Sequence, residues 1–209
     1  MTEPESRVTW DKYYRLINSA HPPIDLFEDI ADPEDWLLLG SGESKTNPRL
    51  AQTIGNLALV PEERRVGGPG ASYLMAPFVH VSPDHQGRFH DGYFGAFYGA
   101  ESFETALFET VYHTQIFCAA TEEAPGWIAD KRELIGKLDT VLTDIRRADN
   151  ANGIVYPSVR NPGGTCFASF HPDVVSAPVQ GHHITYHWDG RKVDMFKVLS
   201  DGSVYAISG

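Results

Sequence analysis

The amino-acid sequence predicts a single domain of the α+β class, with small mixed or antiparallel sheets flanked by helices. Its 209 residues are enough for one sizeable hydrophobic core. A segment with helical spacing follows a short aromatic strand near the middle of the chain, and strand-forming runs separated by turns fill the last third. Within this one domain we distinguish an N-terminal helical support region, residues 1–60, from a core, residues 61–209.

The composition is that of an ordinary soluble globular protein, with 42% hydrophobic and 22% charged residues. The formal net charge of −11 argues against a non-specific nucleic-acid surface, which needs a basic patch to displace counterions from phosphates. No apolar run approaches the roughly 20 residues of a membrane span, and the N-terminus lacks the features of a signal peptide. We therefore expect a cytoplasmic protein. The two cysteines, Cys118 and Cys166, are too few for a disulfide framework, and their apolar surroundings predict inert core thiols.

Helix-start signals mark the N-terminal region. Residues 8–17 read as a strand or a short helix and contain Arg15. Asp32–Pro33 and Asn47–Pro48 each place a capping residue before a proline at the first helical position. The first sixty residues are therefore expected to be helical and irregular.

A loop rich in glycine and proline, residues 61–72, carries Arg64 and Arg65. It does not match a phosphate-binding loop of the GxxxxGKS/T type, so a surface turn is one interpretation. The other is that Arg65 reaches the centre of the chain and clamps a diphosphate together with a second arginine. Residues 76–81 then predict a strand.

The stretch of residues 87–113 is the most informative part of the sequence. Residues 93–98 are dense in aromatic side chains and predict a short buried strand. Ser102 can cap a helix that is expected to run to about His113, and the i, i+3, i+4 spacing of apolar residues gives this helix a core-facing stripe.

Arg88, Tyr98 and Glu109 are the candidate site residues of this stretch. A carboxylate on so apolar a helix is expected to be at least half buried, and a buried charge needs a partner. Arg88 is the candidate partner of Glu109. On spacing alone, a structural ion pair beside a core tyrosine and a functional site are equally good interpretations.

The spacing of leucines and isoleucines predicts a second amphipathic helix over residues 131–148. Its stripe consists of Leu134, Ile135, Leu138, Leu142 and Ile145. Short strands are predicted over residues 154–156 and 165–170, with a turn at 161–164 between them. The C-terminus predicts edge strands over residues 184–188, 195–199 and 204–207, joined by the turns Asp189-Gly190 and Asp201-Gly202.

Ser158 lies at a strand end beside a turn, where side chains reach ligands easily. No Gly-x-Ser-x-Gly elbow surrounds it, so a hydrolase nucleophile is not expected. His182, His183 and His187 lack flanking carboxylates or cysteines, so we predict solvated or structural histidines and no metal site.

Four segments resemble motifs of the RES domain family, which is named for an arginine, a glutamate and a serine. They are GRF at residues 87–89, FYGA at 97–100, ETALFET at 104–110 and GIVYPSVRNPGG at 153–164. The resemblance implies the toxin of a type II toxin–antitoxin system, with a fold related to ADP-ribosyltransferase toxins and NAD+ as its substrate. Such toxins degrade NAD+ with water or phosphate, or transfer its ADP-ribose to a host protein. The implied partner is an Xre-type helix-turn-helix antitoxin, whose C-terminal part blocks the active site.

The resemblance also implies roles for individual residues. The implied catalytic residues are Arg88, Tyr98, Glu109 and Ser158, and the implied NAD-binding residues are Arg65, Arg88 and Tyr98. An upstream arginine of relatives corresponds to either Arg15 or Arg65, and Arg65 is preferred for its glycine-rich loop.

These residue types suit cleavage of the nicotinamide–ribose bond, whose transition state resembles an oxocarbenium ion. Glu109 can stabilise the developing positive charge and hold the ribose hydroxyls. Arg88 can bind the diphosphate and pair with Glu109. Tyr98 offers an aromatic face, and Ser158 can orient the substrate or the glutamate. A second hypothesis, from a different functional class, is that the protein binds a nucleotide or a partner protein without catalysing a reaction.

Overall fold

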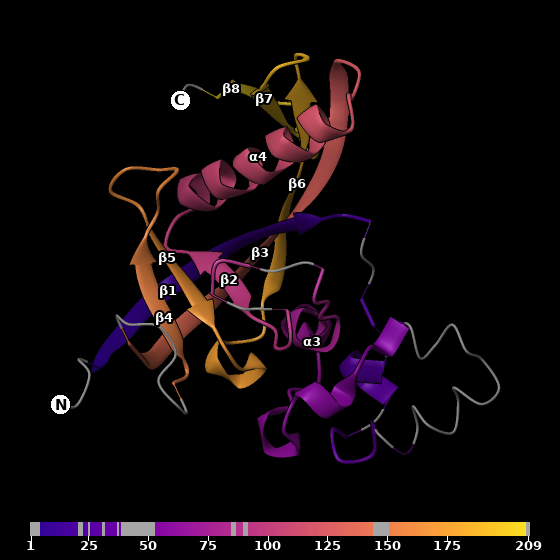
Figure 1. Cartoon of the computed structure of the whole chain (residues 1–209), viewed down its shortest axis with the longest axis vertical. Helices are drawn as coiled ribbons and strands as arrows, with labels where there is room; N and C mark the ends of the chain where they lie inside the picture. The colour runs from indigo at the N-terminus through magenta and orange to yellow at the C-terminus, as the bar shows by residue number, and fades with distance from the viewer. Residues whose placement is uncertain are drawn as a thin grey trace.

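One sheet of eight strands is the central element of the computed structural model (Figure 1). The structure describes residues 5–20, 23–24, 26–30, 32–36, 38, 53–84, 87–89, 92–143 and 151–207. The strands are β1 (Glu5–Asn18), β2 (Phe97–Ala100), β3 (Gly126–Thr143), β4 (Gly153–Pro157), β5 (Thr165–Ser169), β6 (Val179–Trp188), β7 (Val193–Val198) and β8 (Val204–Ala206). The longer helices are α3 (Ala71–Val79) and α4 (Phe103–Ala120). Short π or 3₁₀ helices occupy Leu26–Ile30, Leu57–Leu59, Glu62–Arg64 and Pro172–Val174.

The strand order is β1-β2-β5-β4-β3-β6-β7-β8, and β1 also pairs with β3, so the first five of these strands close into a ring. β1 and β3 pair antiparallel over most of their length. The ring has two narrow joins, because β1 meets β2 at one pair, Tyr14 with Ala100, and β3 meets β4 at one pair, Thr143 with Ile154. The cavity described below lies at the join of β1 and β2.

Helix α3 lies on one side of β1 (Figure 1), and its buried side chains belong to a core rich in aromatic residues. Leu74 and Phe78 of α3 belong to this core together with Tyr13, Phe97 and Phe167. The rings of Tyr13 and Phe167 meet edge to face with centroids 5.5 Å apart, a favoured arrangement of aromatic pairs. This core fixes β1 against β2 and β5.

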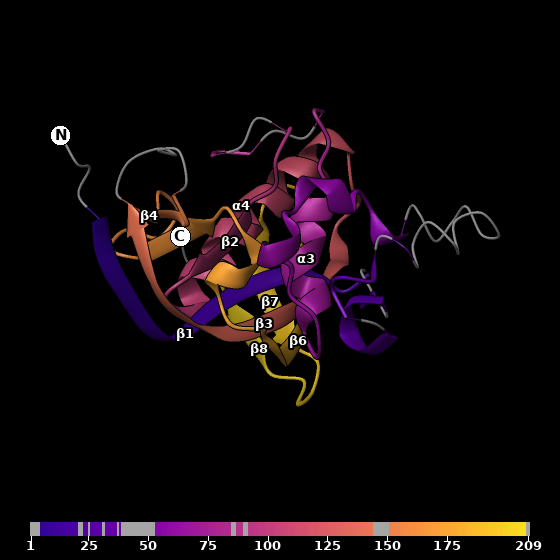
Figure 2. The same ribbon diagram turned by 90° about the horizontal axis from the view of Figure 1, so that it is seen from below.

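Helix α4 lies on the other side of β1 and covers the part of the sheet built from β6 and β7. Figure 2, seen from below, has α3 nearer to the viewer than α4. Leu107 and Val111 of α4 pack with Leu16 of β1 and with Ile184 and Trp188 of β6. This packing fixes the face of α4 that carries Glu109 beside β1 and β2.

Several sequence predictions are confirmed. The domain is of the α+β class, and Ser102 caps α4 by accepting a hydrogen bond from the Thr105 N–H at 3.2 Å. The predicted strands at 154–156 and 165–170 are β4 and β5, and the C-terminal runs form strands β6, β7 and β8. Their prediction as edge strands holds for β8 and is wrong for β6 and β7, each of which pairs with two strands. Helix α4 continues beyond His113 to Ala120.

The prediction of a helix over residues 131–148 is wrong, because residues 126–143 form β3 and residues 144–148 lie outside the described residues. Leu134, Leu138 and Leu142 are fully buried. Their spacing of four is about one helical turn, but it is also two periods of a strand, so both structures place the three leucines on one face. Pairing with β1 and β6 decides the outcome, and Gly136 permits the pairing with β1, since a Cβ there would lie 2.5 Å from the Tyr13 ring.

β3 also explains why one large sheet replaces the small sheets that were expected. This strand pairs with β1, β4 and β6 and so joins the ring to the C-terminal strands.

Two predictions for the N-terminal half need correction. Residues 5–18 form a strand of the ring, so the region 1–60 is not simply a helical support. Of the two interpretations of residues 8–17, the strand is therefore the one that the structure confirms. The strand predicted at residues 76–81 is wrong, because α3 runs from Ala71 to Val79 with Pro77 inside it. The helix start at Asn47–Pro48 lies outside the described residues.

Candidate functional site

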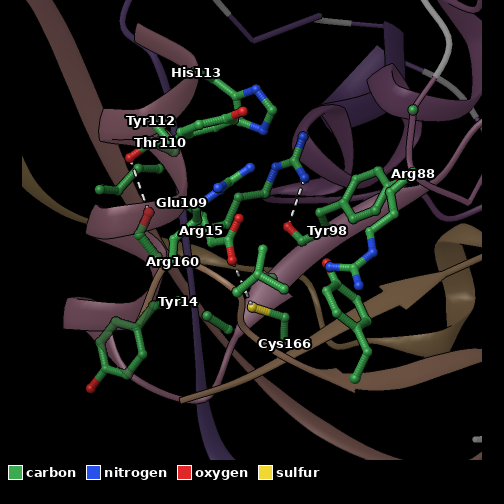
Figure 3. A pocket seen from close by; sticks show the side chains of 17 residues that line it. Tyr14, Arg15, Arg88, Tyr98, Glu109, Thr110, Tyr112, His113, Arg160 and Cys166 are labelled. Carbon is green, nitrogen blue, oxygen red and sulfur yellow. Dashed lines mark hydrogen bonds between the residues drawn. The ribbon is translucent and has the colours of Figure 1, made fainter. Parts of the chain in front are cut away.

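A cavity of about 560 Å³ opens at the narrow join of β1 and β2, beside α4 (Figure 3). It is lined by Tyr14, Arg15, Leu16, Gly87, Arg88, Tyr98, Gly99, Ala100, Ala106, Glu109, Thr110, Tyr112, His113, Tyr156, Val159, Arg160 and Cys166. Three predicted site residues, Arg88, Tyr98 and Glu109, therefore share one cavity. Ser158, the fourth, is hydrogen-bonded to Glu109. Gly99 packs closely on the core, since a Cβ there would lie 2.5 Å from the ring of the buried Phe167.

The Glu109 carboxylate is half-buried and held by Ser158, whose Oγ donates a hydrogen bond to Glu109 Oε1 at 2.6 Å. Ser158 Oγ itself accepts hydrogen bonds from the backbone N–H groups of Arg160 at 3.1 Å and Asn161 at 3.0 Å. A hydroxyl has one proton and two acceptor positions, so these two donors leave the proton directed at Glu109. Ser158 is therefore arranged to stabilise the carboxylate, not to act as a nucleophile.

Arg15 enters the cavity from β1. Its Nη1 donates a hydrogen bond of 2.7 Å to the Tyr98 carbonyl, and its guanidinium lies 4.5 Å from the centroid of the Phe97 ring. Burial lowers the pKa of Arg15 to about 10, so the group stays charged at neutral pH. Its buried Nε has no hydrogen-bond acceptor among the described residues. An unsatisfied buried donor is costly, which is a feature more typical of functional sites than of packing.

Arg88 lies on the far side of the cavity from Glu109 (Figure 3). Its guanidinium lies 4.9 Å from the centroid of the Tyr156 ring and 5.3 Å from that of Phe89. Burial is the main cause that raises the pKa of the Tyr156 and Tyr98 hydroxyls, so both are neutral. The Tyr98 hydroxyl accepts a hydrogen bond from the Phe89 N–H at 3.2 Å, which fixes the segment that carries Arg88.

The expected ion pair between Arg88 and Glu109 is not formed. The ion pairs of the described residues are Arg7 with Asp139 and Arg64 with Asp173, and His187 Nδ1 contacts Asp194 Oδ1 at 2.7 Å; all lie outside the cavity. The arginines of the cavity thus have no carboxylate partner within this part of the chain. Glu109 Oε1 instead accepts hydrogen bonds from neutral donors, Ser158 Oγ at 2.6 Å and Cys166 Sγ at 3.9 Å.

Arg160 is a cavity residue that sequence reasoning missed. Its guanidinium lies 3.3 Å from the centroid of the Tyr112 ring on α4. Tyr112 follows Glu109 by three positions and therefore projects from the same side of the helix. Arg160 follows Ser158 by two positions in the segment GIVYPSVRNPGG, residues 153–164. The sequence contains no signal that places Arg160 against Tyr112, because the two residues lie far apart in the chain.

The structure does not bring Arg65 to the cavity. Its guanidinium donates to the backbone carbonyls of Val60, Pro33 and Leu57 at 3.2, 3.3 and 3.4 Å. Arg65 thus holds together the irregular segments beside α3, and Arg15 is the upstream arginine that lines the cavity.

Both cysteine thiols are buried and free, as predicted. Burial, followed by the charge of Glu109, raises the pKa of Cys166 to about 12, and burial likewise raises the pKa of Cys118. The reactive thiolate is therefore scarce at neutral pH. We expect the native protein to resist iodoacetamide at pH 8 and to be alkylated at both cysteines after denaturation, as measured by intact-mass spectrometry. Rapid alkylation of Cys166 in the native protein would contradict this expectation.

The described residues contain no group of three or more His, Cys, Asp or Glu side chains placed to hold a metal ion. In the same part of the chain, no helix combines the length and the apolar character that crossing a membrane requires. His187 makes a 2.7 Å contact with Asp194 on the neighbouring strand, which agrees with a structural histidine.

Comparison with known proteins agrees with the motifs of the sequence. The sequence model of the RES domain matches residues 62–149 and 140–189. The uncharacterized protein y4oC of Sinorhizobium fredii is similar to this chain, with 29% identity over 208 residues that cover 91% of this chain and 89% of that protein. The matched region includes every residue that lines the cavity except those of β1.

Proposed function

Because the matched domain spans more than half of the chain, this protein belongs to the RES domain family, and we propose that it is a toxin enzyme that consumes NAD+ by cleaving the nicotinamide–ribose bond. The observation that carries the proposal is the charge of the cavity. Among the described lining residues, three are arginines and Glu109 is the one acidic side chain, although the whole chain has a formal net charge of −11. Such a cavity suits an anionic substrate with one site of developing positive charge.

A dinucleotide such as NAD+ has these features. Its diphosphate needs cationic donors, and guanidinium groups bind phosphate oxygens with paired, charge-assisted hydrogen bonds. Arg15, Arg88 and Arg160 are available for this purpose because each is held against an aromatic ring and none forms an ion pair within the described residues. The volume of about 560 Å³ lies in the usual range of small-molecule sites.

The proposed reaction uses Glu109 for electrostatic stabilisation. As the bond to nicotinamide breaks, positive charge grows on the ribose, and a nearby carboxylate stabilises that charge. The hydrogen bond from Ser158 keeps the Glu109 carboxylate in one orientation without supplying a competing cation. Tyr98 and Tyr156 present neutral aromatic rings that can pack against nicotinamide or ribose.

The acceptor of the ADP-ribosyl group separates the two forms of this function. Water or phosphate as the acceptor gives degradation of NAD+, and a host protein gives ADP-ribose transfer. Incubation with labelled NAD+ and a cell lysate distinguishes them, since free product indicates degradation and a single labelled band indicates transfer. We further propose that the protein acts in the cytoplasm and is neutralised by an Xre-type helix-turn-helix antitoxin, which an adjacent helix-turn-helix gene would support.

The test of the proposed function is product analysis. Purified protein is incubated with NAD+, with and without phosphate, and nicotinamide release is followed by chromatography. Enzymatic release supports the proposal. If NAD+ raises the melting temperature but is recovered unchanged under all conditions, the protein is a binding module and the proposed reaction is excluded.

A further inference from the structure

Two hydrogen bonds join α4 to the turn at residues 158–164. One involves Glu109, and the other is made one helical turn earlier, at Thr105. Asn161 Nδ2 donates a hydrogen bond of 2.9 Å to Thr105 Oγ1, and Ser158 Oγ donates one of 2.6 Å to Glu109. Thr105 and Glu109 are four positions apart and therefore lie on the same side of the helix. The turn is thus fixed to α4 at two points, which prevents it from pivoting about the Ser158–Glu109 contact.

Thr105 is built into this position. Its side chain is fully buried, and its hydroxyl lies 2.8 Å from Ser102 Oγ, the cap of α4. The Thr105 hydroxyl therefore accepts from Asn161 and shares a second hydrogen bond with Ser102, in which either hydroxyl can be the donor. Gly164 of the turn packs directly on this hydroxyl, since a Cβ at Gly164 would lie 2.4 Å from Thr105 Oγ1.

Asn161 takes part in the hydrogen bonding at both Thr105 and Ser158. Its side chain binds Thr105, while its backbone N–H donates to Ser158 Oγ at 3.0 Å and so helps direct the Ser158 proton toward Glu109. The turn is closed by the bond from the Gly164 N–H to the Asn161 carbonyl at 2.9 Å. A shift of Asn161 would therefore change the direction of the hydrogen bond that the carboxylate receives.

We propose that Thr105 and Asn161 are positioning residues that hold the Ser158 hydroxyl, and through it the Glu109 carboxylate, in the geometry that the reaction needs. This inference rests on the proposed NAD+ cleavage. Neither residue lines the cavity, so both act through Ser158 and Glu109. A displacement of about 1 Å at reacting groups can cost on the order of a hundredfold in rate. Loss of the hydrogen bond between Asn161 and Thr105 is therefore expected to reduce kcat.

The kinetic test uses Asn161→Ala and Thr105→Val, with Thr105→Ser as the conservative control. We expect kcat for nicotinamide release to fall at least about tenfold in the first two variants, with KM within about twofold of the wild type, and Thr105→Ser to stay near the wild type. In a Ser158→Ala background, Asn161→Ala is expected to add no further loss, because it acts through Ser158. An undiminished kcat, or a further tenfold loss in that background, would overturn the inference.

A second measurement does not depend on activity. Amide hydrogen exchange of Arg160 and Asn161, followed by NMR, is expected to be at least about tenfold faster in Thr105→Val than in the wild type, while amides in the middle of α4 are unchanged. Unchanged exchange at the turn overturns the inference whatever the kinetics show. If the wild type releases no nicotinamide, the proposed function fails by itself, and the exchange rates still decide whether Thr105 holds the turn.

Discussion

Glu109→Gln is expected to lower the rate of nicotinamide release about a thousandfold, because it removes the one acidic side chain among the described residues of the cavity. Glutamine has nearly the same shape, and its amide oxygen can still accept the hydrogen bond from Ser158. The variant therefore keeps the packing of α4 but loses the negative charge that faces the ribose in the transition state. Its thermal unfolding is expected to resemble that of the wild type.

The measurement is the initial rate of nicotinamide release, accompanied by thermal unfolding followed by circular dichroism. Glu104→Gln is the matched control, since Glu104 is an exposed carboxylate in the first turn of the same helix. It is expected to keep the rate within about twofold, because the loss of one favourable charge at a helix N-terminus affects stability only by several tenths of a kcal/mol. A folded Glu109→Gln protein with the wild-type rate would remove Glu109 from the mechanism.

The features of the site that depend on local sequence could be predicted. Ser102 was expected as a helix cap because its hydroxyl and the first turn lie within a few residues of each other, and α4 begins there. The strand–turn–strand unit around Ser158 was predicted for the same reason. Placing Ser158 next to Glu109 required the motif resemblance, because no local rule links positions so far apart in the chain.

The features that depend on long-range pairing could not be predicted. Residues 126–143 have leucine spacing that fits a helix or a strand, and the choice is made by partners in β1 and β6. The cavity exists because β1 closes the ring against β2 at a single pair, which no property of either segment alone reveals. The choice between Arg15 and Arg65 depends on this closure, because β1 is the element that carries Arg15 to the cavity.

Arg15→Lys is expected to raise the KM for NAD+ at least about tenfold while changing the melting temperature by no more than a few degrees. Lysine keeps a positive charge but loses the planar fork that can bind the Tyr98 carbonyl and a phosphate at the same time. A tenfold loss of binding corresponds to about 1.4 kcal/mol, which is close to the lower end of the range for one charge-assisted hydrogen bond. The stability change is expected to be small, because the substitution also removes the buried Nε that has no acceptor among the described residues.

Arg65→Lys is the matched control, and it is expected to show the opposite pattern. Arg65 donates to three backbone carbonyls outside the cavity, so its replacement should lower the melting temperature and leave KM within about twofold of the wild type. Steady-state kinetics with NAD+ and thermal unfolding of both variants provide the comparison. A rise in KM for Arg65→Lys with no change for Arg15→Lys would mean that the substrate does not use the arginine of β1. The contrast between the two variants therefore tests the placement of the diphosphate, independently of whether Glu109 carries the chemistry.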